Sequence, residues 1–89
     1  MTAKVVMYST RFCPYCMRAR RLLKNKDVAF EEIPVGGNND LWEEMEQRSG
    51  RNTVPQIFIN DEPVGGYDDI AALNNRGELD QLLGEDQNG

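Results

Sequence analysis

Two cysteines separated by two residues carry the side chains of this sequence that are best suited to chemistry. Cys13 and Cys16 flank Pro14-Tyr15, and the 89-residue chain has no other cysteine and no histidine. The lack of histidine excludes Ser-His-Asp and Cys-His catalysis, a histidine general base and every histidine-ligated metal site. A C-x-x-C pair in a βαβ context is typical of a redox-active dithiol. We therefore predict thiol chemistry carried out by this single pair.

The flanking residues predict how the two thiols differ. The short apolar run 5–8 predicts a buried strand, and helix signals follow over residues 14–26. A thiolate at Cys13 would face the unpaired N–H groups and the positive end of the helix dipole, with Arg11 nearby, which favours the ionised and reactive form. Cys16 falls one turn inside the helix on its apolar stripe. We expect Cys16 to stay protonated until it acts as the resolving thiol.

Two other interpretations of the cysteines are a pair of inert buried thiols and half of an intermolecular metal site. Two cysteines cannot complete a structural zinc site within one chain, because such a site needs four ligands. Pro14 has no backbone N–H and is therefore poorly suited to a loop whose N–H groups must hold metal-bound sulfur. We predict that the protein has no metal site.

Charge is distributed unevenly along the chain. Residues 1–26 carry no acid, and their charge of +7 against −12 for the remaining residues gives the net −5. A sequence pI near 4.6 and the lack of any nucleic-acid-reading motif argue against a nucleic-acid partner. No apolar run approaches the roughly 20 residues that span a membrane, and residues 1–4 lack the apolar stretch of a signal peptide. We predict a cytoplasmic protein without a membrane partner. The seven early cations are Lys4, Arg11, Arg18, Arg20, Arg21, Lys24 and Lys26.

The middle of the chain predicts a second strand and a second helix. Residues 28–35 alternate loosely between apolar and polar types, which indicates a strand that lies parallel to the first if a helix joins the two. Residues 39–49 show helical spacing with acids in the first turn, and Gly50 follows as a stop signal. The first half of the chain therefore predicts a βαβ unit followed by a helix.

The second half predicts a hairpin and C-terminal helical structure. Residues 56–59 and a short stretch at 63–64 flank the turn residues 60–62. Pro-Val-Gly-Gly occurs at 34–37 and again at 63–66, and we interpret both copies as strand-to-helix turns, because two copies are too few for a solenoid.

A third helix is predicted through residues 71–73, with Asp68 or Asp69 as its N-cap. We predict one domain over residues 1–84 and a flexible tail over residues 85–89. The helical spacing continues after Gly77 at Leu79, Leu82 and Leu83.

Three motifs in this order resemble the glutaredoxins of the small bacterial dithiol class, over residues 5–83. They are Cys13-Pro14-Tyr15-Cys16, then Thr53-Val54-Pro55-Gln56-Ile57-Phe58-Ile59, then Gly65-Gly66-Tyr67-Asp68-Asp69. The resemblance implies an α/β protein with the thioredoxin fold: a βαβ unit, a helix, a β-hairpin and a C-terminal helix, arranged as a four-stranded mixed sheet flanked by helices.

The resemblance also implies an enzyme that reduces protein disulfides and glutathione mixed disulfides. Glutathione would be the co-substrate, no cofactor would stay bound, and the protein would be a monomer. A cis Pro55 would turn the backbone of Val54 toward Cys13, where it could pair with the cysteinyl part of glutathione. The implied glutathione-binding residues are Arg11, Tyr15, Arg51, Thr53, Val54, Pro55, Gly66, Tyr67 and Asp68.

The sequence departs from the family pattern at two positions. Thr10 stands where the family usually has a lysine, so Arg11 would have to replace that contact, and Tyr67 stands where many relatives have a further cysteine. Simpler interpretations stay open for three residues: Pro55 as an ordinary trans residue, Asp68 as a helix cap and Arg51 as a solvated cation.

Two other functions stay open beside the glutathione-dependent enzyme. One is a redoxin that takes electrons from thioredoxin reductase and donates them to ribonucleotide reductase. The other is a binding module that holds an iron-sulfur cluster between two chains through Cys13 and glutathione. Tyr67-Asp68-Asp69 after the Gly pair, and Pro14-Tyr15 between the cysteines, favour glutathione and therefore the first function.

Overall fold

A four-stranded mixed sheet forms the centre of the computed structural model, which describes residues 3–84. The strands are β1 (Val5–Ser9), β2 (Glu31–Pro34), β3 (Gln56–Ile59) and β4 (Glu62–Gly65), in the spatial order β2-β1-β3-β4. β1 and β2 are parallel, whereas β3 is antiparallel to both β1 and β4. The predicted βαβ unit and hairpin are therefore confirmed. The hairpin turns at two residues with positive φ, Asn60 and Asp61.

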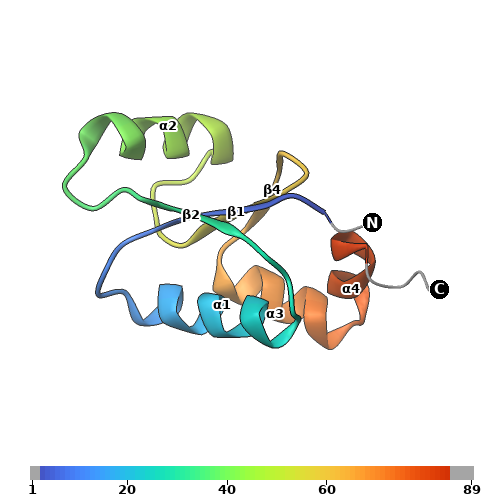
Figure 1. Ribbon diagram of the computed structural model, residues 1–89. Coiled ribbons are helices and arrows are strands. Elements are labelled where there is room, and N and C mark those ends of the chain that lie inside the picture. The colour runs from blue at the N-terminus through green and yellow to red at the C-terminus, as the bar shows by residue number, and fades with distance from the viewer. Residues whose placement is uncertain (1–2, 85–89) are drawn as a thin grey trace.

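Helices cover both faces of the sheet (Figure 1). Helix α2 (Asn39–Ser49) lies on one face, and α1 (Pro14–Asn25) and α3 (Tyr67–Asn75) lie on the other, with α4 (Glu78–Leu83) beyond the end of α3. This is the predicted α/β thioredoxin-type arrangement. It leaves the start of α1 beyond the carboxyl end of the central strand β1, next to the segment that leads into β3.

Alternation along the central strands divides the apolar core into two clusters. Side chains of successive strand residues point to opposite faces, so Val5 and Met7 of β1 pack against α1, α3 and α4, whereas Val6 and Tyr8 pack toward α2. Every residue of β1 is buried, which explains why this strand reads as a continuous apolar run rather than as an alternating one.

The predicted second strand over 28–35 is too long. Strand β2 covers only Glu31–Pro34, because the chain before it still follows the end of α1. The N–H of Val28 donates to the carbonyl of Leu23 at 3.4 Å, and Asp27 adopts a positive φ of 58°. Val28 is buried as the alternation suggested, but by this turn and not by sheet pairing.

Of the two predicted capping residues, Asp69 caps the third helix, but from inside the first turn and not as the N-cap, and the helix does not continue to Leu83. Gly66 is the N-cap of α3, and Asp69 lies inside the first turn, where its carboxylate accepts the Gly66 N–H at 2.9 Å. Asp68 therefore does not cap the helix. After α3 the chain turns at Gly77, whose φ is 75°, and starts a separate short helix, α4. Leu79 and Leu83 of α4 are buried, whereas Leu82 is 40% exposed.

Two predicted element boundaries also differ from the structure by one residue. Helix α1 ends at Asn25, with Lys26 as its C-cap, and β1 extends through Ser9. The Gly-Gly turn before α2 works as predicted, because the Asn38 side chain caps the helix by accepting the Leu41 N–H at 3.1 Å. The predicted tail over 85–89 lies outside the described residues. Over the part of the chain that is described, no helix is long and apolar enough to span a membrane.

Candidate active site

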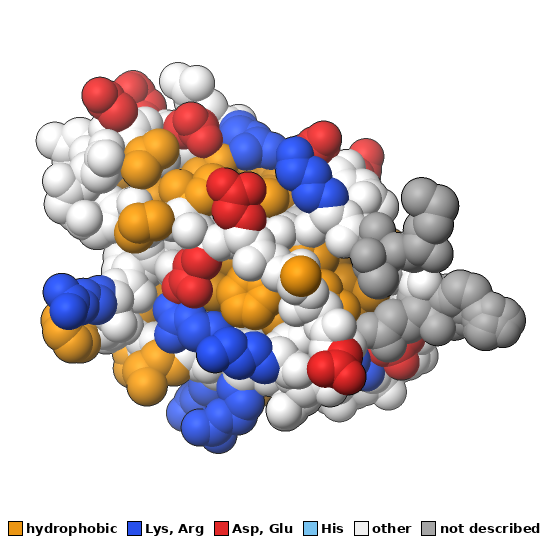
Figure 2. All heavy atoms as spheres, in the orientation of Figure 1, with side chains coloured by type: hydrophobic (Ala, Val, Ile, Leu, Met, Phe, Trp, Pro, Cys, Tyr) orange, Lys and Arg blue, Asp and Glu red, His pale blue; other side chains and the backbone are white. Residues whose placement is uncertain are grey.

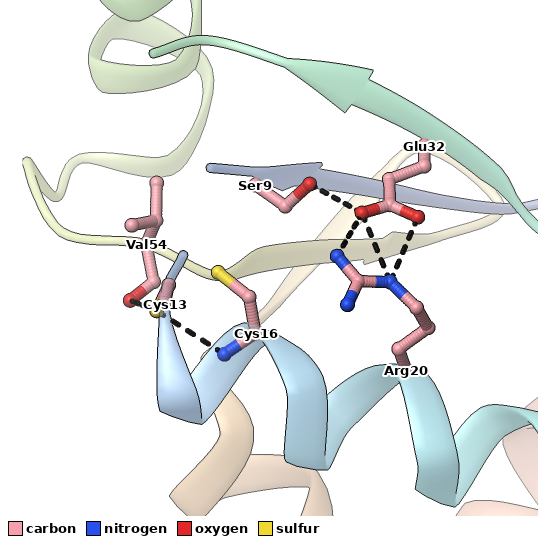
Figure 3. Close-up of polar contacts among 6 residues, drawn as sticks. All are labelled: Ser9, Cys13, Cys16, Arg20, Glu32 and Val54. Atoms are coloured by element: carbon pink, nitrogen blue, oxygen red, sulfur yellow. Dashed lines mark hydrogen bonds and ion pairs between the residues drawn. The ribbon is translucent and has the colours of Figure 1, made fainter. Parts of the chain in front are cut away.

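Cys13 occupies the N-cap position of α1. Pro14 begins the helix at the position where its missing N–H leaves no hydrogen bond unmade. The Cys13 Sγ accepts the N–H of Cys16 at 3.2 Å and lies 3.9 Å from the carbonyl oxygen of Val54, to which it donates (Figure 3). This is the predicted placement at a helix N-terminus, where a backbone N–H points at the sulfur.

Cys16 lies one turn further along α1 and is fully buried. Burial, and next the hydrogen bond with Cys13, raise the pKa of Cys16 to about 12, while the Thr10 backbone and the charge of Arg20 act in the opposite direction. The two cysteines are unbonded. Cys13 is thus partly accessible, whereas Cys16 is buried close behind it.

An ion-pair network that the sequence analysis missed lies on the inner side of Cys16 (Figure 3). Arg20 of α1 donates from Nε to both carboxylate oxygens of Glu32 on β2, at 3.0 and 3.1 Å, and its Nη2 also pairs with Oε2. The hydroxyl of Ser9 donates to the same carboxylate at 2.6 Å. These hydrogen bonds, first the one from Arg20, hold the pKa of Glu32 below its usual value. The sequence signal that could have revealed this neighbour is the i, i+4 spacing of Cys16 and Arg20, which places both on one face of the helix.

The segment before β3 supplies the backbone beside Cys13. The Val54–Pro55 peptide bond is cis, as the resemblance implied. Val54 is 41 residues from Cys13 in sequence, yet its carbonyl faces the Cys13 sulfur. Gln56, a residue that the sequence analysis did not select, is buried and donates from Nε2 to the carbonyl of Thr53 at 3.0 Å and to its hydroxyl at 3.2 Å. The Gln56 side chain thus holds the loop before β3 in place through hydrogen bonds made from the protein interior.

A pocket of about 370 Å³ opens next to this segment. It brings together eight of the nine predicted glutathione-binding residues, which come from the start of α1, the loop before β3 and the start of α3. The rings of Tyr15 and Tyr67 lie 6.5 Å apart at its wall. Gln56 and Asp69 complete a lining that otherwise consists of Tyr15, Arg51, Thr53, Val54, Pro55, Gly66, Tyr67 and Asp68.

Arg11 is the predicted binding residue that the structure does not bring to this pocket. Its guanidinium lies 5.6 Å from the centre of the exposed Phe12 ring, and the residue lines a different cavity together with Arg20 and Glu32. Thr10 lines that second cavity too. The chain turns between Thr10 and the start of α1, and both Thr10 and Arg11 lie at that turn, away from the residues that line the first pocket.

Arg51 is not the free cation that one of the sequence interpretations assumed. Its Nη1 lies 2.8 Å from Oδ2 of Asp69, and the same oxygen accepts the N–H of Gly66. These two contacts, first the one with Arg51, hold the pKa of Asp69 below its usual value. The sequence analysis considered Asp69 only as a cap. In the structure it joins the loop before β3 to the start of α3, the two walls of the pocket.

No three His, Cys, Asp or Glu residues within residues 3–84 are grouped so that they could hold a metal ion. The described site instead contains a thiol at a helix N-terminus, a second thiol one turn behind it, and an open backbone segment beside both. This arrangement is suited to thiol–disulfide exchange, because the first sulfur can form a mixed disulfide and the second can displace the bound group.

Comparisons with known proteins agree with this chemistry. The family model described as Glutaredoxin matches residues 5–64. Glutaredoxin 3 of Escherichia coli (strain K12) is 54% identical over 81 residues, which cover 91% of this chain and 98% of that protein. The solution structure of glutaredoxin from Brucella melitensis superimposes with a TM-score of 0.83 at 46% identity, covering 97% of this chain and 94% of that one.

A structure with a ligand in its title is also similar. The buckwheat glutaredoxin–glutathione complex has a TM-score of 0.85 at 27% identity and covers 93% of this chain and 78% of that chain. The family match, the thioredoxin fold and the paired thiols at the start of α1 agree with one another and confirm the predicted fold and activity. The chain therefore belongs to the glutaredoxin family and is a glutathione-dependent thiol–disulfide oxidoreductase.

Proposed function

We propose that Cys13 is the attacking thiol and Cys16 the resolving thiol of this enzyme. The observation that carries the assignment is the contrast between the two sulfurs: Cys13 is accessible and accepts an N–H at the helix N-terminus, whereas Cys16 is buried. Thiolates and not thiols attack disulfides. The accessible sulfur at the helix N-terminus is therefore the one that meets the substrate.

The reaction then has two routes. The Cys13 thiolate attacks a disulfide, a Cys13–substrate mixed disulfide forms and the other substrate sulfur leaves as a thiol. With a protein disulfide, Cys16 attacks Cys13, the Cys13–Cys16 disulfide forms and the reduced protein leaves; two glutathione molecules then reduce that disulfide and become glutathione disulfide. With a glutathionylated substrate, Cys13 takes the glutathione, and a second glutathione releases it without Cys16.

We place glutathione in the 370 Å³ pocket. The backbone of Val54 faces the position of the reacting sulfur, so an extended peptide can pair with it as a strand would. The N–H groups at the start of α3 suit the carboxylate of the γ-glutamyl end, and the Asp68 carboxylate can accept from its amino group. Arg51 at the other wall suits the glycyl carboxylate. The similarity to a glutaredoxin–glutathione complex supports this placement.

Replacing the two cysteines singly separates the roles. Cys13→Ser removes the nucleophile, so we expect loss of both protein-disulfide reduction and deglutathionylation. Cys16→Ser leaves deglutathionylation within about threefold of the wild type and abolishes dithiol reduction, because only the second route needs no resolving thiol. Both activities are measured with glutathione and glutathione reductase. A Cys13→Ser protein with full activity in either assay would contradict the assignment.

We also propose a docking surface for protein substrates beside Cys13. Phe12 is 86% exposed and Met17 is 56% exposed, which is unusual for apolar side chains this large. Arg11 and Arg18 flank them; their contacts are with the rings of Phe12 and Tyr15, and neither forms an ion pair within the described residues. Figure 2 shows Lys and Arg side chains gathered over the region of α1. This surface fits a protein whose disulfide lies among acidic and apolar residues.

The double variant Phe12→Ser/Arg18→Glu tests the docking surface. We expect kcat/KM for a glutathionylated acidic protein to fall about tenfold, because both the apolar contact and the charge attraction are lost. Activity on a short neutral glutathionylated peptide should change less than about threefold, since it does not reach this surface. Arg76→Glu changes charge equally at the far end of α3 and serves as the control. Equal losses on both substrates would show that the surface does not select proteins.

In this proposal the electron donor is glutathione and not thioredoxin reductase. We also propose that the protein acts in the cytoplasm as a monomer without a bound cofactor. The pocket supports the choice of donor, because its walls suit a tripeptide with carboxylates at both ends. Coupling the protein in turn to glutathione reductase with glutathione and to thioredoxin reductase tests the donor. A brown colour of the freshly purified protein would instead support the iron-sulfur interpretation.

A further inference from the structure

The ion-pair network behind Cys16 has no role in the mechanism given above. We infer that Arg20, held in place by Glu32, is a positioning residue for the resolving step: its charge stabilises the Cys16 thiolate as that sulfur attacks the mixed disulfide on Cys13. This inference rests on the proposed dithiol mechanism. It concerns only the second cysteine.

The geometry places Arg20 against Cys16. Residues four apart on a helix lie on the same face, with Cβ atoms about 5–6 Å from each other. Figure 3 shows both side chains rising from the same side of α1 toward the sheet, the sulfur on the side of Cys13 and the guanidinium on the side of β2. Cys16 is buried, so solvent screens this pair less than it would screen a surface pair.

Glu32 and Ser9 keep the guanidinium at this position. Arg20 makes hydrogen bonds with both carboxylate oxygens of Glu32, and Ser9 anchors that carboxylate to the end of β1. Only about a quarter of the Arg20 side chain and a third of the Glu32 side chain are exposed. Ser9 directly precedes Thr10, whose backbone contacts Cys16. The network therefore ties the resolving thiol to two strands.

The charges around Cys16 explain why such a residue is needed. Burial disfavours the thiolate of Cys16, and the neighbouring Cys13 sulfur disfavours it further. Arg20 is the cation that acts against these effects, Glu32 partly neutralises Arg20, and Lys24 acts on Glu32. When Cys13 enters a mixed disulfide, its own charge disappears. The attraction between Arg20 and the Cys16 thiolate then remains while Cys16 ionises, and burial alone opposes it.

The step balances as a thiol–disulfide exchange. Cys16 loses its proton, its sulfur attacks Sγ of Cys13, and the bond between Cys13 and the substrate sulfur breaks as the Cys13–Cys16 bond forms. The substrate sulfur leaves with the electron pair and takes up a proton. Cys16–SH and Cys13–S–S–R thus give the intramolecular disulfide and R–SH. Arg20 exchanges neither electrons nor protons.

Rapid mixing of the reduced protein with one equivalent of dithionitrobenzoate separates the two steps. Attack by Cys13 releases the first coloured thionitrobenzoate in a phase whose rate depends on reagent concentration. Attack by Cys16 releases the second in a phase that does not. Cys16→Ser must lose the second phase; if it does not, the dithiol mechanism itself fails, and this outcome differs from any failure of the Arg20 inference.

Arg20→Met should slow the second phase about tenfold, because loss of one compensating charge at this range changes an ionisation equilibrium by about that factor. Arg21→Met removes the same charge from an exposed position one residue away, and it should leave the second phase within about twofold of the wild type. Arg20 also interacts with the Cys13 sulfur, so Arg20→Met should slow the first phase too, but by a smaller factor than it slows the second. Equal slowing of the second phase by the two variants would overturn the inference.

Glu32→Gln tests the inference independently, and it can be used even if Arg20→Met does not fold. Gln keeps an oxygen that can accept from Arg20 but no longer neutralises it, so the second phase should become about threefold faster. A network that only holds the helix in place predicts the same sign for both substitutions, namely slower resolution. Slower or unchanged resolution in Glu32→Gln would therefore overturn the role of the charge.

Discussion

At the scale of single residues, Gly65 lies so close to the Asp69 carboxylate in the pocket wall that no side chain fits between them. Its φ is 105°, and a Cβ placed there would lie only 2.3 Å from Oδ2 and 2.6 Å from Cγ of Asp69. That carboxylate is the one that binds Arg51 and the Gly66 N–H. Glycine is required at this position for two independent reasons: the backbone conformation and the approach of the Asp69 side chain.

We expect Gly65→Ala to destabilise the protein by about 2–4 kcal/mol, because strain at positive φ adds to displacement of the Asp69 carboxylate. The KM for glutathione should rise as the pocket wall shifts. Gly37→Ala is the matched control: its φ is 74°, but nothing lies within 4 Å of the added Cβ. It should cost only about 1 kcal/mol. Urea unfolding measures both values, and equal losses would show that the Asp69 contact contributes nothing.

At the scale of elements, the pair Arg20–Glu32 fastens α1 to β2 within the βαβ unit. The parallel strands β1 and β2 are joined only through α1, so the orientation of that helix decides where its first turn presents the cysteines. Ser9 adds β1 to the same contact. One carboxylate on β2 therefore joins all three elements of the unit.

This contact makes stability depend on pH. The folded-state pKa of Glu32 lies below its unfolded value near 4.3, so its stabilisation is complete above about pH 5 and is lost as the pH falls through the folded value. We expect Glu32→Gln to lower the free energy of unfolding by about 1–2 kcal/mol at pH 7. The loss is modest because the Arg20–Glu32 pair is partly exposed and therefore contributes less than a buried ion pair would. The difference should shrink as the pH falls below about 4, because the folded protein then takes up the proton that the unfolded chain already holds.

Urea titrations at pH 7, 5 and 3, chosen to bracket the ordinary carboxyl range of about 4, measure this prediction. Glu31→Gln serves as the control, because Glu31 is exposed on the same strand and forms no ion pair within residues 3–84. A difference between wild type and Glu32→Gln that is the same at all three pH values would contradict the ionic origin of the contact.

At the scale of the whole molecule, the two ends of the described chain meet. The N–H of Ala3 donates to the carbonyl of Leu83 at 3.1 Å, and Leu83 is fully buried in the same core cluster as Val5. Helix α4 thus closes the core face that α1 and α3 cover only in part. Its neighbour Leu82 points outward and is 40% exposed.

We expect Leu83→Ala to lower the free energy of unfolding by about 2–4 kcal/mol, because it removes a fully buried side chain and leaves a cavity. Leu82→Ala makes the same chemical change one residue earlier and should cost less than about 1 kcal/mol, since that side chain already contacts water. Thermal and urea unfolding of the two variants give the comparison. Similar losses at both positions would mean that α4 does not close the core.

The sequence by itself determined the features that depend on neighbouring residues. The cysteine pair at a strand-to-helix junction, the βαβ order, the helix starts at Pro14 and Asn39, and the hairpin turn all follow from spacing, capping and turn chemistry within a few residues. The cis bond at Pro55 and the composition of the pocket came from the family resemblance, because neither follows from local pattern.

Only the tertiary structure decided which distant side chains meet. Arg20 and Glu32 are 12 residues apart, Arg51 and Asp69 are 18 apart, and Cys13 and Val54 are 41 apart. Local pattern carries no information about such pairs, since they depend on how the strands order in the sheet and where each helix crosses it. The same cause separates Arg11 from the pocket that the family resemblance implied for it: Arg11 lies in the turn before α1 and lines another cavity with Arg20 and Glu32.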